Sequence, residues 1–323
     1  MNILITGGLG LIGSTLARRL LLDDPAAEIT LLDSLIPQYG GNRANIDDLA
    51  GRVNVNISDL RDSFATRELL KGVDLVFNLA AQTSHADSMV DPLTDLDINA
   101  RAQLSLLEAV RAVCPEAVVV FTSTRQIYGR PHYLPVDEAH PIRPVDVNGV
   151  SKVAGEQFHI LYHDVYGLRT TCLRLTNTYG PGMRIRDARQ TFLGIWVRNL
   201  LQGNPIQVFG DGLQRRDFNH VDDVVRALIL SAKSPACYGR AFNIGSDEVV
   251  SLSALASLIC NFVPDSRWEL VPFPADRKAI DIGDYFTDFS LANQLLGWRP
   301  RISLADGLSR TLDFYRDRLL SYL

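Results

Sequence analysis

Three glycines near the beginning of the chain have the type and spacing needed to hold a dinucleotide. Gly7, Gly10 and Gly13 lie in the segment ITGGLGLIGSTLARRL, directly after a predicted strand and at the start of a predicted helix. Glycine lets the backbone approach a pyrophosphate closely, and the first N–H groups of the helix then point toward its charge. Asp33 ends the next predicted strand, about 20 residues farther along. A carboxylate there binds the two ribose hydroxyls of an adenosine and repels a 2′-phosphate, so the pattern predicts NAD rather than NADP.

Neighbouring residues add further candidate contacts to this cofactor. Leu11 and Ile12 lie inside the glycine motif, and Asp59 and Leu60 follow the third predicted strand, where the edge of an adenine would lie. Asp59 could instead cap the next helix, because aspartate is a favoured N-cap residue. Both interpretations of Asp59 remain open at the level of sequence.

A parallel sheet must position these residues, and the hydrophobic pattern predicts one. Short apolar runs alternate with segments of helical periodicity, at residues 2–6, 28–33, 53–58, 74–80, 117–123 and 170–176. Fully apolar strands that alternate with helices are typical of a parallel sheet covered on both faces. The predicted fold class is therefore α/β, a Rossmann-type doubly wound parallel sheet that binds its ligands at the carboxyl ends of the strands.

The pattern changes after residue 176, where a second region begins. Loops rich in glycine, proline and arginine appear, followed by predicted helices near 190–202, 222–234, 251–263 and 304–321 with short strands between them. We expect residues 1–176 to form the NAD-binding domain. Residues 177–323 are expected to form mainly a smaller α/β substrate-binding lobe, with some chain returning to the first domain.

The composition excludes several classes of protein. The 323 residues are 46% hydrophobic and 21% charged, and no apolar run approaches the length needed to span a bilayer. A net charge of −5 without a run of basic residues argues against binding to nucleic acid or to a membrane surface. The four cysteines are widely spaced in apolar segments, so we expect reduced core thiols and no metal site. The N-terminus has no basic segment or cleavage site of a secretory signal, so a cytoplasmic protein is expected.

A series of motifs in a fixed order shows a family resemblance. The motifs are TGGLGLIG (6–13), LAAQTS (79–84), DINA (97–100), TSTRQIYG (122–129), SK (151–152), LTNTYGPG (175–182), VFGDGLQRRDFNHVDD (208–223), FNIGS (242–246) and LLGWRP (295–300). The chain resembles the extended short-chain dehydrogenases/reductases of the nucleotide-sugar epimerase/dehydratase branch, and within it the UDP-glucose 4-epimerases. The resemblance implies tightly bound NAD that is reduced and reoxidised within one turnover. It also implies cofactor contacts from Leu79, Ala80, Ala81, Asn99 and Lys152.

The resemblance also suggests where a nucleotide-diphosphate sugar would bind. It implies that Asn177 and Arg216 hold the diphosphate, and Arg277 lies near the position of a second diphosphate arginine. Independently of any family, a diphosphate needs forked cationic donors together with neutral amide donors. Arg216 could alternatively form a surface ion pair with Asp211 or Asp217. The motif positions suggest three more substrate contacts: Thr83, Ser84 and Arg125.

One expected catalytic residue is missing. Relatives in this family use a Ser/Thr, Tyr and Lys trio, in which the tyrosine takes a hydroxyl proton as hydride leaves and the lysine lowers its pKa. Ser123, Thr124 and Lys152 match this trio, but Asn148 occupies the tyrosine position. An amide neither gains nor loses a proton near neutral pH, so Asn148 can position a hydroxyl but cannot be the general base.

Three explanations of Asn148 remain open. In the first, another group substitutes for the tyrosine: Lys152 through a water, Tyr128, or His85. Alternatively the protein binds NAD and a nucleotide-sugar with little redox chemistry, or the asparagine is an engineered replacement. Intact cofactor and phosphate features around Asn148 favour a substitute group.

The sequence thus predicts an NAD-dependent nucleotide-sugar epimerase with an atypical active site, and C4 inversion is the first guess. The alternatives are a dehydratase or decarboxylase of the same branch, or a non-catalytic binding protein. Thr124 is followed by Arg125 and Gln126 rather than by an acid pair, which argues against a dehydratase. A homodimer is also expected, because relatives pair two long helices of each subunit in the dimer interface. The matching helices here, at about 92–113 and 148–167, carry apolar residues beyond one narrow stripe, as helices buried against both a sheet and a partner would.

Overall fold

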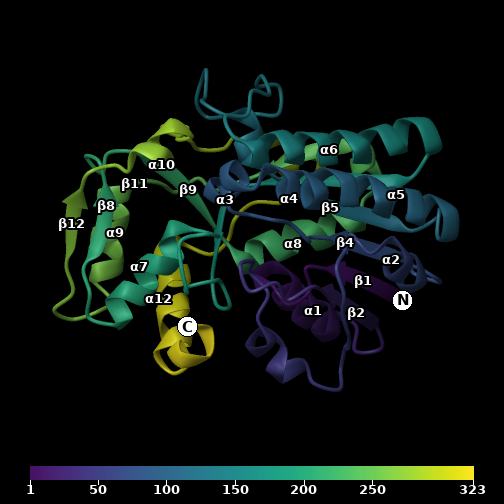
Figure 1. The fold of residues 1–323 in the computed structure, drawn as a ribbon, viewed down its shortest axis with the longest axis horizontal. Coiled ribbons are helices and arrows are strands. Elements are labelled where there is room, and N and C mark those ends of the chain that lie inside the picture. The colour runs from purple at the N-terminus through teal and green to yellow at the C-terminus, as the bar shows by residue number, and fades with distance from the viewer.

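The computed structural model describes residues 1–323, and its central element is a seven-stranded parallel sheet (Figure 1). The strand order is β10-β6-β5-β4-β1-β2-β3, so the order reverses between β1 and β4. The strands are β1 (Asn2–Thr6), β2 (Glu28–Asp33), β3 (Asn54–Ile57), β4 (Leu75–Asn78), β5 (Val118–Thr124), β6 (Arg169–Leu175) and β10 (Arg240–Ile244). The predicted doubly wound parallel sheet is confirmed.

Helices cover both faces of this sheet, because its strands are apolar on both sides. On one face α1 (Leu11–Asp23) packs beside α8 (Val221–Ala232), and on the other α2 (Ser63–Leu69), α5 (Ala102–Val113) and α6 (Val147–Tyr166) pack side by side (Figure 1). Two separate clusters of buried apolar side chains lie under these two layers. No helix is both long and apolar enough to cross a bilayer.

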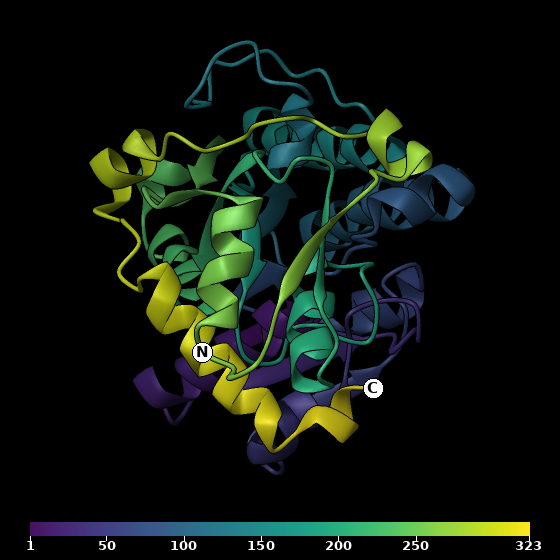
Figure 2. The same cartoon turned by 90° about the vertical axis from the view of Figure 1, so that its left-hand side faces the viewer.

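The chain after residue 176 builds the lobe that Figure 2 turns toward the viewer. Its strands are β7 (Asn177–Tyr179), β9 (Arg215–His220) and β11 (Val249–Ser251) in one sheet, and β8 (Ile206–Phe209) and β12 (Trp268–Val271) in another. Its helices are α7 (Phe192–Leu201), α9 (Leu252–Cys260), α10 (Ala275–Ala279), α11 (Ser290–Leu296) and α12 (Leu304–Arg316). The same half of the chain also supplies α8 and β10 to the large sheet.

Helix α6 carries Asn148 and Lys152, and α3 (His85–Val90), α4 (Pro92–Leu96) and the turn that follows it pack against α6. The helix expected at about 92–113 is interrupted: α4 (Pro92–Leu96) passes into a wide π-helical turn at Asp97–Arg101 before α5 begins. The N-terminus of α6 is capped by Asp146, whose Oδ1 accepts a hydrogen bond from the Gly149 N–H at 2.7 Å. The short helix α3 (His85–Val90) packs against this end of α6.

Candidate active site

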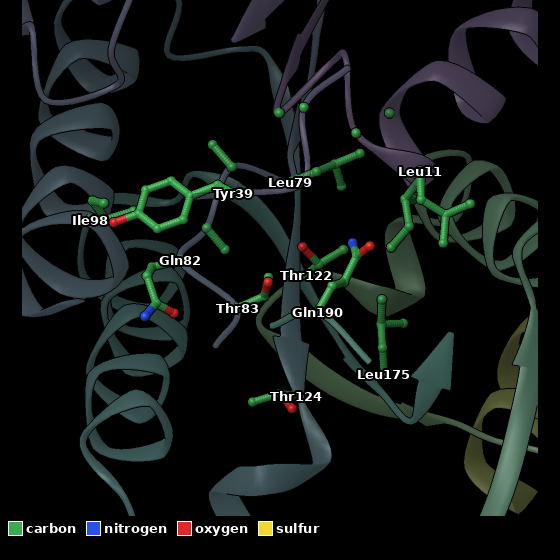
Figure 3. A pocket seen from close by; sticks show the side chains of 18 of the residues that line it. Leu11, Tyr39, Leu79, Gln82, Thr83, Ile98, Thr122, Thr124, Leu175 and Gln190 are labelled. Atoms are coloured by element: carbon green, nitrogen blue, oxygen red, sulfur yellow. The ribbon is translucent and has the colours of Figure 1, made fainter. Parts of the chain in front are cut away.

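A cavity lies at the carboxyl end of the parallel sheet, where the strand order reverses. Figure 3 shows Leu11 on one side of it, Tyr39 and Gln82 on the other, and Thr124 at the end remote from Leu79. Most of the residues expected from the sequence line this cavity. They are Gly7, Gly10, Leu11, Ile12, Gly13, Asp33, Asp59, Leu60, Leu79, Ala80, Ala81, Thr83, Ser123, Thr124, Arg125, Asn148, Lys152 and Asn177.

The glycine turn leaves room beside the backbone where a ligand could lie. Gly7 has a φ of +67°, and a Cβ there would lie 3.0 Å from the Ala80 nitrogen of the neighbouring strand end. A Cβ on Gly13 would lie 2.4 Å from the Gly7 carbonyl oxygen, so both glycines are required for close packing of the turn. A Cβ on Gly10 would instead meet only the Gly7 oxygen, at 3.3 Å. The turn is therefore tight inside the protein and open toward the cavity.

Asp33 is held rigidly at the end of β2. Its Oδ2 accepts a hydrogen bond from the Leu9 N–H at 3.0 Å and its Oδ1 accepts one from the Leu35 N–H at 2.9 Å. Burial raises the pKa of Asp33, and these two hydrogen bonds act in the opposite direction. Each oxygen keeps a further acceptor position, so the carboxylate can receive both hydroxyls of a ribose.

Asp59 lines the same cavity and does not cap a helix. Its carboxylate pairs with Arg61 at 2.7 Å, and this contact lowers the pKa of Asp59. Asp62 caps α2 instead, accepting hydrogen bonds from the N–H groups of Phe64 and Ala65. The capping interpretation of Asp59 is therefore wrong, because the N-cap of the helix is Asp62, three residues later.

Ser123 and Thr124 end β5 at the far part of the cavity. The Oγ of Ser123 is buried and has no hydrogen-bond partner in the protein. The Oγ1 of Thr124 accepts a hydrogen bond from the Gln126 N–H at 3.2 Å and so begins the turn that follows. Buried hydroxyls are almost always paired, so the free Ser123 Oγ indicates a ligand or a water in the cavity.

Lys152 lies in the same part of the cavity, one turn after Asn148 on α6. Its side chain is 5% exposed, and its Nζ donates to the Thr122 carbonyl at 3.0 Å and lies 4.8 Å from the centre of the Phe121 ring. Burial lowers the pKa of Lys152 to about 8, although the charge of Asp95 acts in the opposite direction. The remaining N–H donors of the ammonium are free to bind a ligand.

The side-chain amide of Asn148 is held by buried acceptors. Its Nδ2 donates to the Gln82 carbonyl at 2.8 Å and to Asp95 Oδ2 at 3.0 Å. Asn99 was expected to contact the cofactor, but it does not line the cavity, and its Nδ2 donates to the same two groups, at 2.9 and 3.0 Å. Asn99 and Asn148 therefore share the same two acceptors, and the sequence did not reveal the role of the buried Asp95.

His85 lines the cavity beside Asn148. The Oγ of Ser88 donates to the His85 carbonyl at 2.7 Å and accepts from the Asn148 N–H at 3.2 Å, so a single hydroxyl joins the two backbones. The Nδ1 of His85 lies 3.0 Å from Oδ2 of Asp146, whose side chain is completely buried. His85 and Asp146 thus form a pair whose imidazole is accessible from the cavity.

Tyr128 is not available for proton transfer in this cavity. It is fully buried, its hydroxyl donates to Asn243 Oδ1 at 2.7 Å and accepts from Arg174 Nη1 at 2.6 Å, and it does not line the cavity. Burial raises the pKa of Tyr128 well above its usual value. The suggestion that Tyr128 replaces the missing tyrosine is therefore wrong, because the hydroxyl is committed to a structural network.

Arg125 and Asn177 face each other at the substrate end of the cavity. Arg125 Nη2 donates to Asn177 Oδ1 at 3.1 Å, while Asn177 Nδ2 donates to the Asp217 carbonyl at 3.1 Å. Burial lowers the pKa of Arg125, which has no carboxylate in ion-pair contact. One cationic and one amide group are thus brought together, as an anion would require.

Three residues expected to contact the substrate do not line the cavity. Arg216 is 5% exposed; it donates to the Gly283 carbonyl and lies 3.5 Å from Asp281. It pairs with neither Asp211 nor Asp217, so the predicted surface ion pair with one of these aspartates is also wrong. Ser84 caps α3 through its Oγ, and Arg277 lies on α10 above the Phe209 ring.

Two loops that are distant in sequence meet at the cavity. Arg184 Nη1 donates to the carbonyls of Pro37 and Tyr39, at 3.0 and 2.6 Å, and the Arg184 N–H donates to Gln190 Oε1 at 2.9 Å. Tyr39 and Gln190 both line the cavity (Figure 3). Neither residue was expected from the sequence, because loops carry no hydrophobic period that would place them.

Comparison with known proteins agrees with this geometry. Residues 3–245 match the model of the NAD dependent epimerase/dehydratase family. The UDP-glucose 4-epimerase of Mycolicibacterium smegmatis is 32% identical over 321 residues, covering 98% of this chain and 99% of the relative. The UDP-glucose 4-epimerase of Thermotoga maritima, solved with UDP-glucose, superposes with a TM-score of 0.89 at 29% identity, covering 99% of this chain and 100% of that one.

A second solved structure extends the comparison to another reaction. The dTDP-glucose 4,6-dehydratase of Streptomyces venezuelae, solved with NAD bound, superposes with a TM-score of 0.88 at 30% identity, covering 98% of each chain. The similarity thus includes relatives that catalyse different reactions on nucleotide-sugars. With its parallel sheet, glycine turn and full-length similarity, the chain belongs to the NAD dependent epimerase/dehydratase family.

Proposed function

We propose that the protein is an NAD-dependent epimerase of a nucleotide-diphosphate sugar, acting through a transient keto-sugar, with inversion at C4 as the first reaction to test. One observation carries the proposal: a single cavity joins the glycine turn and Asp33 at one end to Ser123, Lys152 and Asn177 at the other. A dinucleotide and a sugar can therefore meet inside it. The family contains epimerases of closely similar length and fold.

The residues present fit NAD. The open side of Gly10, the paired oxygens of Asp33 and the unpartnered Ser123 Oγ are the features that a bound dinucleotide and sugar would satisfy. Asp33 would hold the adenosine ribose, the helix start after Gly10 the pyrophosphate, and Lys152 the ribose near the nicotinamide. When bound, NAD supplies the acceptor and later the donor of a hydride.

The protein's own groups would orient the sugar and stabilise its charge. Ser123 and Thr124 would donate to the oxygen of the reacting hydroxyl, and the ammonium of Lys152 would stabilise negative charge on it. Asn148, held by Gln82 and Asp95, would present its Oδ1 as a fixed acceptor for the hydroxyl or an ordered water. Thr83 lines the same part of the cavity and would contact the sugar.

Arg125, Asn177 and Arg216 are proposed to hold the diphosphate. Burial and, to a smaller extent, the nearby charge of Arg125 lower the pKa of Arg216 to about 10. Two arginines so close to each other repel, and a bound diphosphate would relieve this repulsion further than Asp281, 3.5 Å from Arg216, does alone. Arg216 would leave the Gly283 carbonyl to reach that anion, and Arg277 would approach from α10.

Two other reactions and one other class of protein are distinguishable from epimerisation. Only epimerisation leaves the mass of the sugar unchanged, whereas a dehydratase removes water and a decarboxylase removes carbon dioxide. A purely binding protein would hold NAD and the nucleotide-sugar without turnover. The test is mass and proton NMR analysis of UDP-glucose, dTDP-glucose and a UDP-linked uronic acid after incubation with the purified protein. A product of unchanged mass and inverted configuration is expected, and a product of lower mass would contradict the proposal.

Asp33→Asn should weaken NAD binding by about 10- to 100-fold, because a hydrogen bond to a charged group contributes about 1.5–3 kcal/mol. It should also reduce discrimination against NADP, since a neutral amide does not repel the 2′-phosphate. Calorimetric titration of both dinucleotides measures the effect, with Asp23→Asn as the control, because Asp23 is exposed on α1 and pairs with Arg19. Unchanged NAD affinity in Asp33→Asn would show that the cofactor lies elsewhere.

A homodimer through the helices beside the cavity is part of the proposal. Several apolar side chains on α4 and α6 remain exposed, namely Leu93, Leu96, Leu161, Val165 and Tyr166. A second copy packed on these helices would cover them, and exposed apolar clusters are typical of such interfaces. Sedimentation at micromolar concentration should give a dimer, and Leu161→Glu with Val165→Glu should give a monomer. A wild-type protein that is only monomeric at this concentration would contradict the dimer.

A further inference from the structure

We propose that His85, oriented by Asp146, accepts the hydroxyl proton of the sugar in place of the missing tyrosine. This inference rests on the proposed function, since it names the proton acceptor of that reaction. It starts from the position of His85 on the wall of the cavity, one hydroxyl away from the backbone of Asn148.

The carboxylate of Asp146 is built to hold an imidazole. It is completely buried, its Oδ1 accepts from the Gly149 N–H at 2.7 Å, and its Oδ2 accepts from Gln126 Nε2 at 2.8 Å and lies 3.0 Å from His85 Nδ1. Burial alone would raise the pKa of Asp146, but the contact with His85 and the hydrogen bonds from Gly149 and Gln126 lower it. Asp146 is therefore an ionised carboxylate in a fixed position.

An ionised carboxylate at Nδ1 determines where the neutral imidazole carries its proton. The Nδ1 of His85 lies 3.0 Å from Asp146 Oδ2 but is not aligned for a hydrogen bond, and no protein group bonds to Nε2. A rotation of the ring that aligns Nδ1–H with the carboxylate would keep the proton on Nδ1 and leave the lone pair on Nε2. The side chain is 37% exposed and lines the cavity, so Nε2 is a free acceptor within reach of a bound sugar.

The other candidate acceptors are less suitable. With a pKa of about 8, the amine of Lys152 is mostly protonated at neutral pH, and an ammonium cannot accept a proton. Asp95 is fully buried, does not line the cavity and already binds Asn99 and Asn148. His85 is the titratable side chain at the sugar end that combines a free lone pair with access from the cavity.

The proposed step conserves atoms and charge. The proton of the sugar O–H moves to Nε2 of His85, the C–H electron pair leaves as hydride to bound NAD, and a C=O bond forms at that carbon. On return, hydride is added to the opposite face of the carbonyl carbon and Nε2 gives its proton back to the oxygen. Asp146 does not exchange a proton; it stabilises the imidazolium formed in between.

Charged groups from neighbouring elements lie near this pair. Arg125, in the turn after β5, interacts with the charge of Asp146. On the helix that carries His85, Asp87 pairs with Arg189 at 2.9 Å.

The first test measures single-turnover reduction of NAD in the wild type and its variants. The substrate is the nucleotide-sugar that the wild type oxidises, chosen from UDP-glucose, dTDP-glucose and a UDP-linked uronic acid. His85→Gln should slow reduction by about 100- to 10,000-fold, the usual contribution of a positioned general base. His85→Ala should regain rate when free imidazole is added, since the ring lies open to the cavity. His132→Ala, at an exposed histidine away from the cavity, is the matched control and should react like the wild type. A His85→Gln variant that reacts at the wild-type rate would overturn the proposal.

Asp146 is a positioning residue, and its test separates orientation from folding. Asp146→Ser keeps a side-chain oxygen for the N-cap of α6 but removes the carboxylate at Nδ1. We expect a slower rate with an altered pH profile and a normal thermal transition. A changed melting temperature with an unchanged pH profile would assign Asp146 a purely structural role and contradict the proposal.

A second measurement needs no substrate. Nitrogen NMR of the imidazoles, with His85 assigned by its absence in His85→Gln, should show neutral His85 protonated on Nδ1. Protonation on Nε2 would overturn the proposal whatever the activity, because Nε2 could then not accept a proton. A wild type that oxidises none of the three sugars would argue against the proposed function, while the NMR result would still decide the arrangement of His85 and Asp146.

Discussion

Lys152→Ala should lower the rate of NAD reduction by about 1,000-fold, because it removes the one buried cation that can stabilise a developing alkoxide. The ammonium lies between the Thr122 carbonyl and the Phe121 ring, so its position is fixed before a substrate binds. Lys152→Met keeps most of the side-chain volume and should lose nearly as much, which separates charge from packing. Lys71→Ala, at an exposed lysine paired with Glu68, is the control.

The pH profile distinguishes two roles of Lys152. Its pKa is about 8, so the side chain is a cation below this pH and a neutral amine above it. If Lys152 acts as a cation, the rate falls as the pH rises past about 8; if it acts as the base through a water, the rate rises there. We expect the fall. A rise that disappears in Lys152→Met would identify Lys152, rather than His85, as the acceptor.

Asn148→Ala should slow NAD reduction by about 10- to 100-fold, the scale of a misplaced reactant rather than of a lost base. The change removes the two hydrogen bonds to the Gln82 carbonyl and Asp95 and the fixed acceptor that faces the cavity. Single-turnover reduction of NAD measures the loss, and it should be clearly smaller than that of Lys152→Ala.

Asn148→Tyr tests the opposite account of the same residue. In this account the protein became inactive when its tyrosine was replaced by asparagine, and the wild type does not reduce NAD. A tyrosine at this position would then restore NAD reduction, since Ser123 and Lys152 still line the same cavity. We expect no gain over the wild type. A gain would mean that the natural chain is a binding protein and that no substitute base operates.

The sheet and the cofactor end were predictable because their signals are local. Each of these signals lies within one short stretch of sequence: the apolar strands, the glycine spacing and Asp33. Each acts through the backbone of its own segment. The runs predicted at residues 2–6 and 28–33 coincide with β1 and β2. Ser123, Thr124 and Lys152 also follow from motif positions, and the structure places them on the cavity wall, while their catalytic roles are proposals.

The supporting contacts were not predictable because they depend on distant segments. The π-helical turn at Asp97–Arg101 turns Asn99 away from the cavity and toward Asp95, and no periodicity in the sequence signals that turn. The contacts of Arg216 with Asp281 and the Gly283 carbonyl could not be predicted, because these partners lie far along the chain. Burial of an arginine is decided by tertiary packing, which residue type does not reveal.

The pairing of His85 with Asp146 shows the same limit in the catalytic region. Histidine on a loop is usually solvated, and the aspartate before Asn148 has the ordinary signature of a helix cap. Only the packing of α3 on the start of α6 brings Nδ1 to within 3.0 Å of the carboxylate. An acidic residue two positions before the altered tyrosine position was the one signal in the sequence that could have indicated it.

The central claim is that this chain transfers hydride between a sugar and NAD without the usual tyrosine. The most direct measurement is rapid mixing of the NAD-loaded wild type with each of the three nucleotide-sugars while the near-ultraviolet absorbance of reduced nicotinamide is followed, with mass analysis of the product. The account predicts a transient rise in that absorbance and an isomer of unchanged mass for at least one sugar. A protein that binds NAD and the nucleotide-sugars yet never reduces the nicotinamide would contradict it.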